Sequence, residues 1–107
     1  MNLITYWNRG AQELFGWTPE QAIGKPADEL FLTIFPGPVK EIREELRLRG
    51  RWDSELTKTK ADGTKIVVSS RWSLQRDPQN HCKAILETNH DISLSLVRVL
   101  GWMWMAA

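Results

Sequence analysis

The side chains best suited to chemistry in this sequence are its single cysteine, Cys82, and its two histidines, His81 and His90. A metal site needs several Cys, His, Asp or Glu ligands that converge, and a nucleophile needs an orienting base. A single cysteine also excludes an internal disulfide and the paired-thiol patterns of redox and zinc sites. We therefore expect no metal, and we interpret Cys82 as a small buried or edge side chain at the start of a strand.

Carboxylates provide the other candidate chemistry. Asp53 and Glu55 lie on a segment with strand periodicity, so their side chains share one face and could imitate a catalytic carboxylate pair. Charged residues are rarely buried unless they are paired, which favours a solvated strand face over catalysis. The same argument places Glu41, Glu44 and Glu45 on the solvated side of a helix. The sequence thus predicts no catalytic residues and no enzyme.

Composition is that of an ordinary globular protein. The 107 residues are 42% apolar and 25% charged, which suffices for one hydrophobic core but not for two. The 14 basic and 13 acidic residues are scattered along the chain and leave a formal charge of +1. Because no basic stripe forms, we expect no binding to nucleic acid.

The two ends of the sequence bear on its location. Residues 1–8 lack the basic segment and apolar run of a secretion signal. Residues 94–107 are mostly apolar, but they include Arg98 and are too short for a membrane span, which needs about 20 apolar residues. Together with the single cysteine, these features predict a cytoplasmic location without a membrane span.

The amino-terminal half predicts several short helices. Asn8 is a suitable cap for a helix that ends at Gly16, and Thr18 with Gln21 fits a capping box for the next helix. The expected elements are a strand at Leu3–Trp7, short helices within 8–16 and 18–24, one helical turn within 28–35, and a longer helix over 39–48.

After Gly50 the apolar period changes from helical to two, which predicts strands. These strands cover 51–56, 66–74 and 82–92. Gly63 supplies the positive φ that a hairpin turn requires between the first two strands, and a second turn lies at 77–80. We therefore expect an antiparallel meander.

Several of these segments resemble parts of a PAS domain. Residues 4–25, ITYWNRGAQELFGWTPEQAIGK, are similar to the stretch in which a strand of that family feeds the pattern N-x-x-[AF]-x-x-[LM]-[FY]-G-[YW]. GRWDSEL at 50–56 and KADGT at 60–64 resemble the third-strand region and its hairpin, and TNHDIS at 88–93 resembles the end of the last strand. The resemblance implies an α+β fold, a PAS-like antiparallel sheet with short helices packed on one face.

The sequence departs from the family pattern at both ends. A PAS domain normally has a further strand before Leu3–Trp7, in the middle of its sheet, and continues after its last strand into a charged signalling helix. We therefore expect a PAS-like domain over residues 1–93 without its usual first strand, and an apolar tail over 94–107. The tail could replace the absent strand, form a short helix or frayed end, or close a dimer. Trp102 and Trp104 favour a protein-contact surface or strand replacement.

The resemblance implies a sensory box of a bacterial signalling protein such as a sensor histidine kinase of a two-component system. Such a module binds a small ligand or a partner, and the resulting population shift passes to an output domain or kinase. The alternative is a ligand-free protein-protein interaction module that holds two chains together. Self-association is expected under either interpretation.

A ligand cavity would lie between the sheet and the helices. The candidate lining residues are Trp17, Leu30, Ile42, Leu46 and Trp72. Core filling is the favoured role of the large rings Trp7, Trp17, Trp52 and Trp72, with a border to the cavity as the alternative. Haem-binding members of the family use a histidine on the long helix, and flavin-binding light sensors use a cysteine on an earlier helix. Neither residue is present there, so haem and covalently reacting flavin are disfavoured and the ligand stays unassigned.

Overall fold

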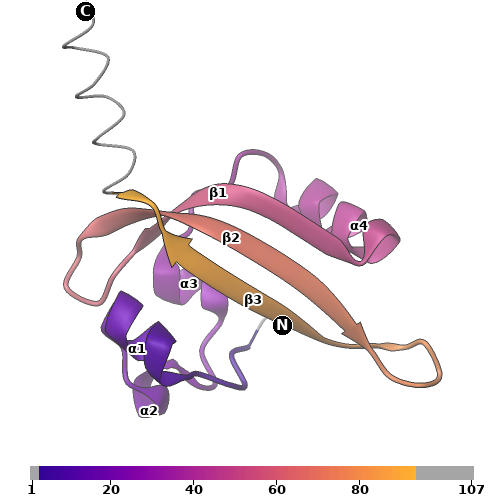
Figure 1. Ribbon diagram of the computed structural model, residues 1–107, viewed down its shortest axis with the longest axis horizontal. Coiled ribbons are helices and arrows are strands. Elements are labelled where there is room, and N and C mark those ends of the chain that lie inside the picture. The colour runs from indigo at the N-terminus through magenta and orange to yellow at the C-terminus, as the bar shows by residue number, and fades with distance from the viewer. Residues whose placement is uncertain (1–2, 94–107) are drawn as a thin grey trace, which may run out of the picture.

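Four helices precede a three-stranded antiparallel sheet in the computed structural model, which describes residues 3–93 (Figure 1). The helices are α1 (Arg9–Phe15), α2 (Pro19–Ala22), α3 (Ala27–Phe31) and α4 (Val39–Arg49). The strands β1 (Arg51–Thr59), β2 (Lys65–Arg76) and β3 (Cys82–Asp91) follow in the order β1-β2-β3. The predicted α+β class is confirmed. The expected roles of the tail and of Trp102 and Trp104 lie outside the described residues.

The predicted helix caps form as expected. Asn8 Oδ1 accepts a 2.8 Å hydrogen bond from the Ala11 amide at the start of α1. At α2, Thr18 Oγ1 accepts from the Gln21 amide and Gln21 Oε1 accepts from the Thr18 amide, which completes the capping box. These contacts satisfy amides that the first turn of a helix leaves without partners, so even very short helices are stabilised.

The strand predicted at Leu3–Trp7 is not formed. Leu3 makes an isolated bridge to Pro26, and Ile4 exchanges hydrogen bonds with the Lys25 carbonyl and the Gly24 amide, both within 2.9 Å. A strand needs a neighbouring strand along its length, and among residues 3–93 the backbone of this extended segment pairs only with the turn after α2. The strand prediction for Leu3–Trp7 was therefore wrong for the described residues: the segment is extended, but no ladder forms along it between residues 3 and 93.

The three predicted meander strands are confirmed, and β1 and β2 are longer than the sequence pattern indicated, whereas β3 ends one residue earlier. The register pairs Trp52 with Trp72 and Leu56 with Val68 between β1 and β2. Because side chains alternate across a sheet, these pairs share the face that the helices cover. On β1 this buried face continues to Lys58, beyond the end predicted at Leu56.

The β1–β2 hairpin forms at the predicted turn and also receives α1. Gly63 has a φ of 89°, and Asp62 Oδ1 accepts a hydrogen bond from the Thr64 amide, which lowers the pKa of the Asp62 carboxyl group. The Ala61 amide donates to the Phe15 carbonyl at 2.8 Å. The hairpin therefore anchors the end of α1 against the sheet.

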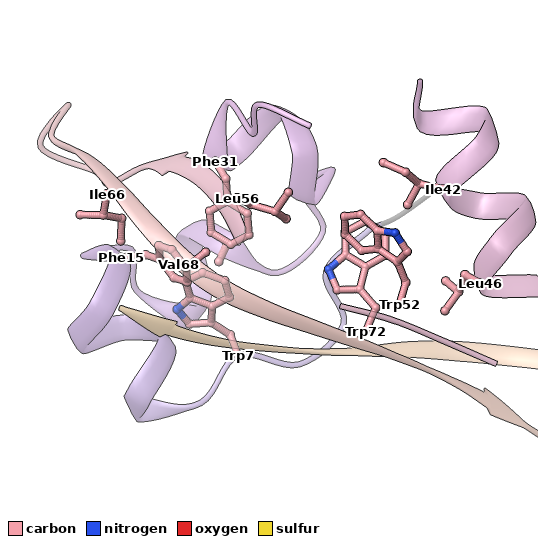
Figure 2. Packing of buried hydrophobic residues seen from close by; sticks show 11 residues of the cluster. Trp7, Phe15, Phe31, Ile42, Leu46, Trp52, Leu56, Ile66, Val68 and Trp72 are labelled. Atoms are coloured by element: carbon pink, nitrogen blue, oxygen red, sulfur yellow. The ribbon is translucent and has the colours of Figure 1, made fainter. Parts of the chain in front are cut away.

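The core divides into two aromatic groups along the inner face of the sheet (Figure 2). In one group Trp7, Phe15 and Phe31 lie with ring centroids 4.4 to 5.9 Å apart. In the other, Trp52 and Trp72 meet edge to face at 5.0 Å beside Ile42 and Leu46 of α4. The burial of Trp7, Trp52 and Trp72 confirms their predicted positions in the core.

Candidate functional site

A surface groove of about 200 Å³ lies between α4 and the adjoining ends of β2 and β3. Leu46 reaches it from the buried face of α4, one turn after Ile42. Trp72 and Leu74 alternate along β2 on the inner face, and Ile85 of β3 is paired with Leu74. Helical and strand periodicity thus bring four apolar side chains, Leu46, Trp72, Leu74 and Ile85, to one floor.

Two arginines on α4 line the groove beside this floor. Arg43 and Arg47 are one turn apart on the helix, so both guanidinium groups lie along the same side. Arg47 donates to Glu44 at 2.6 Å, and this hydrogen bond lowers the pKa of Glu44 and raises that of Arg47. Within the described range 3–93, Arg43 has no ion-pair partner. The lining therefore carries a surplus of positive charge.

Arg76 ties the end of β2 to the groove. Its Nη2 donates to the Arg47 carbonyl at 3.1 Å, which links β2 to α4. Its Nη1 donates to the Asn80 carbonyl at 3.2 Å and to Cys82 Sγ at 3.4 Å, which fixes the β2–β3 turn. Cys82 is exposed at the first position of β3 and lines the groove, so the predicted edge position is confirmed.

A second, more polar groove of about 310 Å³ lies on the other side of α4, lined by Glu45, Arg49, Arg51, Trp52 and Asp53. Asp53 pairs with Arg71 at 3.3 Å, and both side chains are largely exposed to solvent. Glu55 is exposed as well. The carboxylate pair of β1 is therefore a solvated strand face, as predicted.

A buried lysine lies beneath the helices at the other end of the sheet. Lys58 on β1 is only 1% exposed, and its Nζ is 2.6 Å from Glu87 Oε2 on β3. The same ammonium group lies 4.1 Å from the centre of the Phe31 ring. Asn89 donates to the same Glu87 oxygen at 3.0 Å. Because a buried charge is costly without a partner, this cluster neutralises Lys58 inside the fold.

Three buried side-chain atoms have no hydrogen-bond partner among the described residues: Trp17 Nε1, Thr33 Oγ1 and Asn89 Oδ1. Asn89 on β3 is paired with the buried Ser70 on β2, so its side chain faces the interior. A free carbonyl oxygen therefore lies beside the buried Lys58–Glu87 pair.

The five predicted lining residues are divided between two parts of the structure. Leu46 and Trp72 line the groove, and Ile42 is buried one turn away on α4. Trp17 and Leu30 pack against the core cluster and do not reach the groove. A ligand-lining role for these residues stays a prediction.

Sequence reasoning missed the charged members of both sites. The period-two pattern of Trp52 and Leu56 extends to Lys58, which would have indicated that this lysine faces inward. Arg43 and Arg47 share a helical face, but that spacing alone is typical of any solvated helix. Only the groove that α4 forms with β2 and β3 distinguishes this face from the others.

Comparison with known families assigns the fold. The model of the PAS fold family matches residues 2–92, almost the whole chain. The chain belongs to the PAS family. PAS domains are generally sensory, non-catalytic modules, and this membership supports a role in sensory signalling. No curated protein matches the chain.

Solved PAS and LOV structures share the architecture. A PAS domain from Colwellia psychrerythraea is 26% identical, with a TM-score of 0.73 over 86% of this chain and 79% of that chain. The dark structure of the blue-light photoreceptor Aureochrome1 LOV is 21% identical, with a TM-score of 0.72 over 97% and 76%. An RNA-binding light-oxygen-voltage receptor is 16% identical, with a TM-score of 0.77 over 97% of this chain and 30% of that chain. The last two likenesses show the fold alone.

Between residues 3 and 93, no three His, Cys, Asp or Glu side chains lie close enough together to hold a metal ion. No helix in the same range has the length and apolar character that a membrane crossing requires.

Proposed function

We propose that this PAS domain is a cytoplasmic sensory or regulatory module that binds a small ligand and relays the signal to an output domain, such as a histidine kinase of a two-component system. The observation that carries the proposal is the groove between α4 and the ends of β2 and β3. A molecule bound there touches the longest helix and two strands at once. The proposed role is binding without turnover, in keeping with the generally sensory, non-catalytic role of PAS domains.

The relay rests on differential binding. A ligand that contacts α4 and β3 together stabilises the packing in which these elements are close. It therefore lowers the population of any packing in which they are farther apart. Arg76 already couples the same elements through Arg47 and Cys82. A change in the distance between α4 and β3 would therefore move the β2–β3 turn and the end of the sheet, because Arg76 connects them.

Native mass spectrometry of the freshly purified protein tests the proposal. We expect a small molecule that is retained in the native spectrum and released on denaturation. Ile85→Arg should lose this molecule because it fills the groove floor, whereas Leu86→Arg, next along β3 and on the opposite face, should keep it. Two results together would contradict ligand binding. Every preparation would show the apo mass, and a metabolite extract would not protect Cys82 from alkylation.

A ligand-free dimerisation module is the second candidate, and the exposure of β3 favours it. β3 is an edge strand of the described sheet, and Ile85 and Leu86 are 41% and 52% exposed (Figure 1). An edge strand with exposed apolar side chains is a template for pairing with another chain. In this alternative the module joins two copies and the groove stays empty.

Sedimentation velocity across a range of protein concentrations separates the candidates. A ligand-free dimer would support the dimerisation module if Leu86→Lys dissociates it. The matched control is Leu48→Lys at an exposed position of α4, which should leave that dimer intact. A small molecule that stays bound at all protein concentrations, whether the protein is a monomer or a dimer, would support the sensor.

A further inference from the structure

The groove beside α4 combines two features that single out one chemical class of ligand. Its floor is apolar, formed by the four side chains Leu46, Trp72, Leu74 and Ile85. Trp72 is held in place because its Nε1 donates to Ser70 Oγ at 3.1 Å, so the ring offers a fixed apolar wall. A surface of this kind favours contact with hydrocarbon or an aromatic ring over water.

The charge at the groove is positive and partly unused. Glu44 neutralises Arg47, while Arg43 has no ion pair among the described residues. Arg76 adds a third guanidinium group next to Cys82. Guanidinium groups bind carboxylates through two parallel hydrogen bonds, which a hydrated ammonium ion does not reproduce.

We propose that this groove binds a small carboxylate with an apolar body, its charged end at Arg43 and its body against Trp72, Leu74 and Ile85. The inference rests on the proposed ligand-binding function and specifies its substrate class. The groove volume of about 200 Å³ lies below the usual range of about 300 to 1,000 Å³ for drug-sized ligands, so the ligand is small. An inorganic anion would leave the apolar floor unused, and a neutral hydrocarbon would leave Arg43 unused.

Cys82 provides a built-in reporter because it is the only cysteine and lines the groove. The probe is 3-phenylpropionate, and the readouts are the rate of Cys82 alkylation by iodoacetamide and the NMR shift of the Trp72 indole N–H. We expect saturable slowing of alkylation and a saturable shift with one common dissociation constant. The neutral 3-phenylpropanamide should bind about tenfold more weakly, as the loss of one charge-assisted contact predicts. Inorganic phosphate should produce neither effect.

Matched arginine variants on α4 locate the charged end. Arg43→Gln should weaken 3-phenylpropionate about tenfold, whereas Arg49→Gln should leave the affinity unchanged because Arg49 pairs with Glu45 away from the groove. Equal affinity of the two variants, or equal binding of acid and amide, would overturn the inference.

The outcome separates this inference from the proposed function. If a neutral or cationic molecule co-purifies and protects Cys82 while the carboxylate does not, ligand sensing survives and the carboxylate assignment fails. If neither the probe nor any retained molecule protects Cys82, both fail.

Discussion

At the scale of single residues, the unusual feature is a lysine inside the core. Lys58 reaches across β2 from β1 to Glu87 on β3, residues that are 29 positions apart in sequence. The ion pair joins the two outer strands of the described sheet beneath the Phe31 ring. Replacing one partner of such a pair leaves an uncompensated charge in a low-dielectric site, whereas removing both leaves none.

Glu87→Gln should therefore lower the free energy of unfolding by about 3 kcal/mol, since the buried Lys58 would lose its carboxylate partner. The double variant Lys58→Met with Glu87→Gln should be clearly more stable than Glu87→Gln alone. Urea unfolding followed by tryptophan fluorescence measures both changes. Asp53→Asn, which removes the exposed pair with Arg71, is the control and should cost less than about 1 kcal/mol. Similar losses in Glu87→Gln and Asp53→Asn would contradict the structural role of the buried pair.

At the scale of elements, the contact between α1 and the β1–β2 hairpin is fixed by a glycine. Gly16 ends α1 with a φ of 85°, and a Cβ atom built there would lie 3.2 Å from Ala61 Cβ on the hairpin. The preceding Phe15 carbonyl accepts from the Ala61 amide. Helix termination and helix-to-sheet docking therefore depend on the same residue.

Comparison of Gly16→Ala with Gly50→Ala separates these two contributions. Both glycines have positive φ, but an added Cβ at Gly50 meets nothing within 4 Å. Gly50→Ala should cost about 1 kcal/mol from backbone strain alone, and Gly16→Ala about 1 kcal/mol more from crowding against Ala61. Thermal and urea unfolding give the two values. If the losses are equal, close packing of α1 on the hairpin does not contribute to stability.

At the scale of the whole molecule, the helices cover the sheet unevenly. The inner positions of β1 and β2 are buried, while β3 is exposed along most of its length (Figure 1). Within residues 3–93, no backbone hydrogen bond reaches the outer edge of β3. The edge strand is therefore the part of the sheet most easily altered by a ligand in the groove or by a second chain.

Hydrogen exchange should reveal this gradient. Amides of β2, which lies between two strands, should exchange slowest, and those amides of β3 that point away from β2 should exchange fast at low protein concentration. Two-dimensional NMR after transfer to deuterated water resolves them individually. Uniform protection of β3 at a level equal to β2 would show that another segment or chain covers the edge. Protection that grows with concentration would identify the cover as a second copy.

The sequence by itself determined the features that depend on near neighbours. The caps at Asn8 and Thr18, the hairpin turn at Gly63 and the alternation in β1 and β2 all follow from residues a few positions apart, and the structure confirms each of them. The resemblance to PAS domains was likewise readable, because its motifs are local segments in a fixed order.

Tertiary structure alone decided the rest. Leu3–Trp7 has strand propensity but forms only an isolated bridge, because a strand also needs a partner that propensity does not supply. The pairing of Lys58 with Glu87, and the meeting of Arg43, Trp72 and Ile85 at one groove, join residues from separate elements. Such contacts depend on how α4 packs on the sheet and how β3 pairs with β2, and no local pattern in the sequence encodes that arrangement.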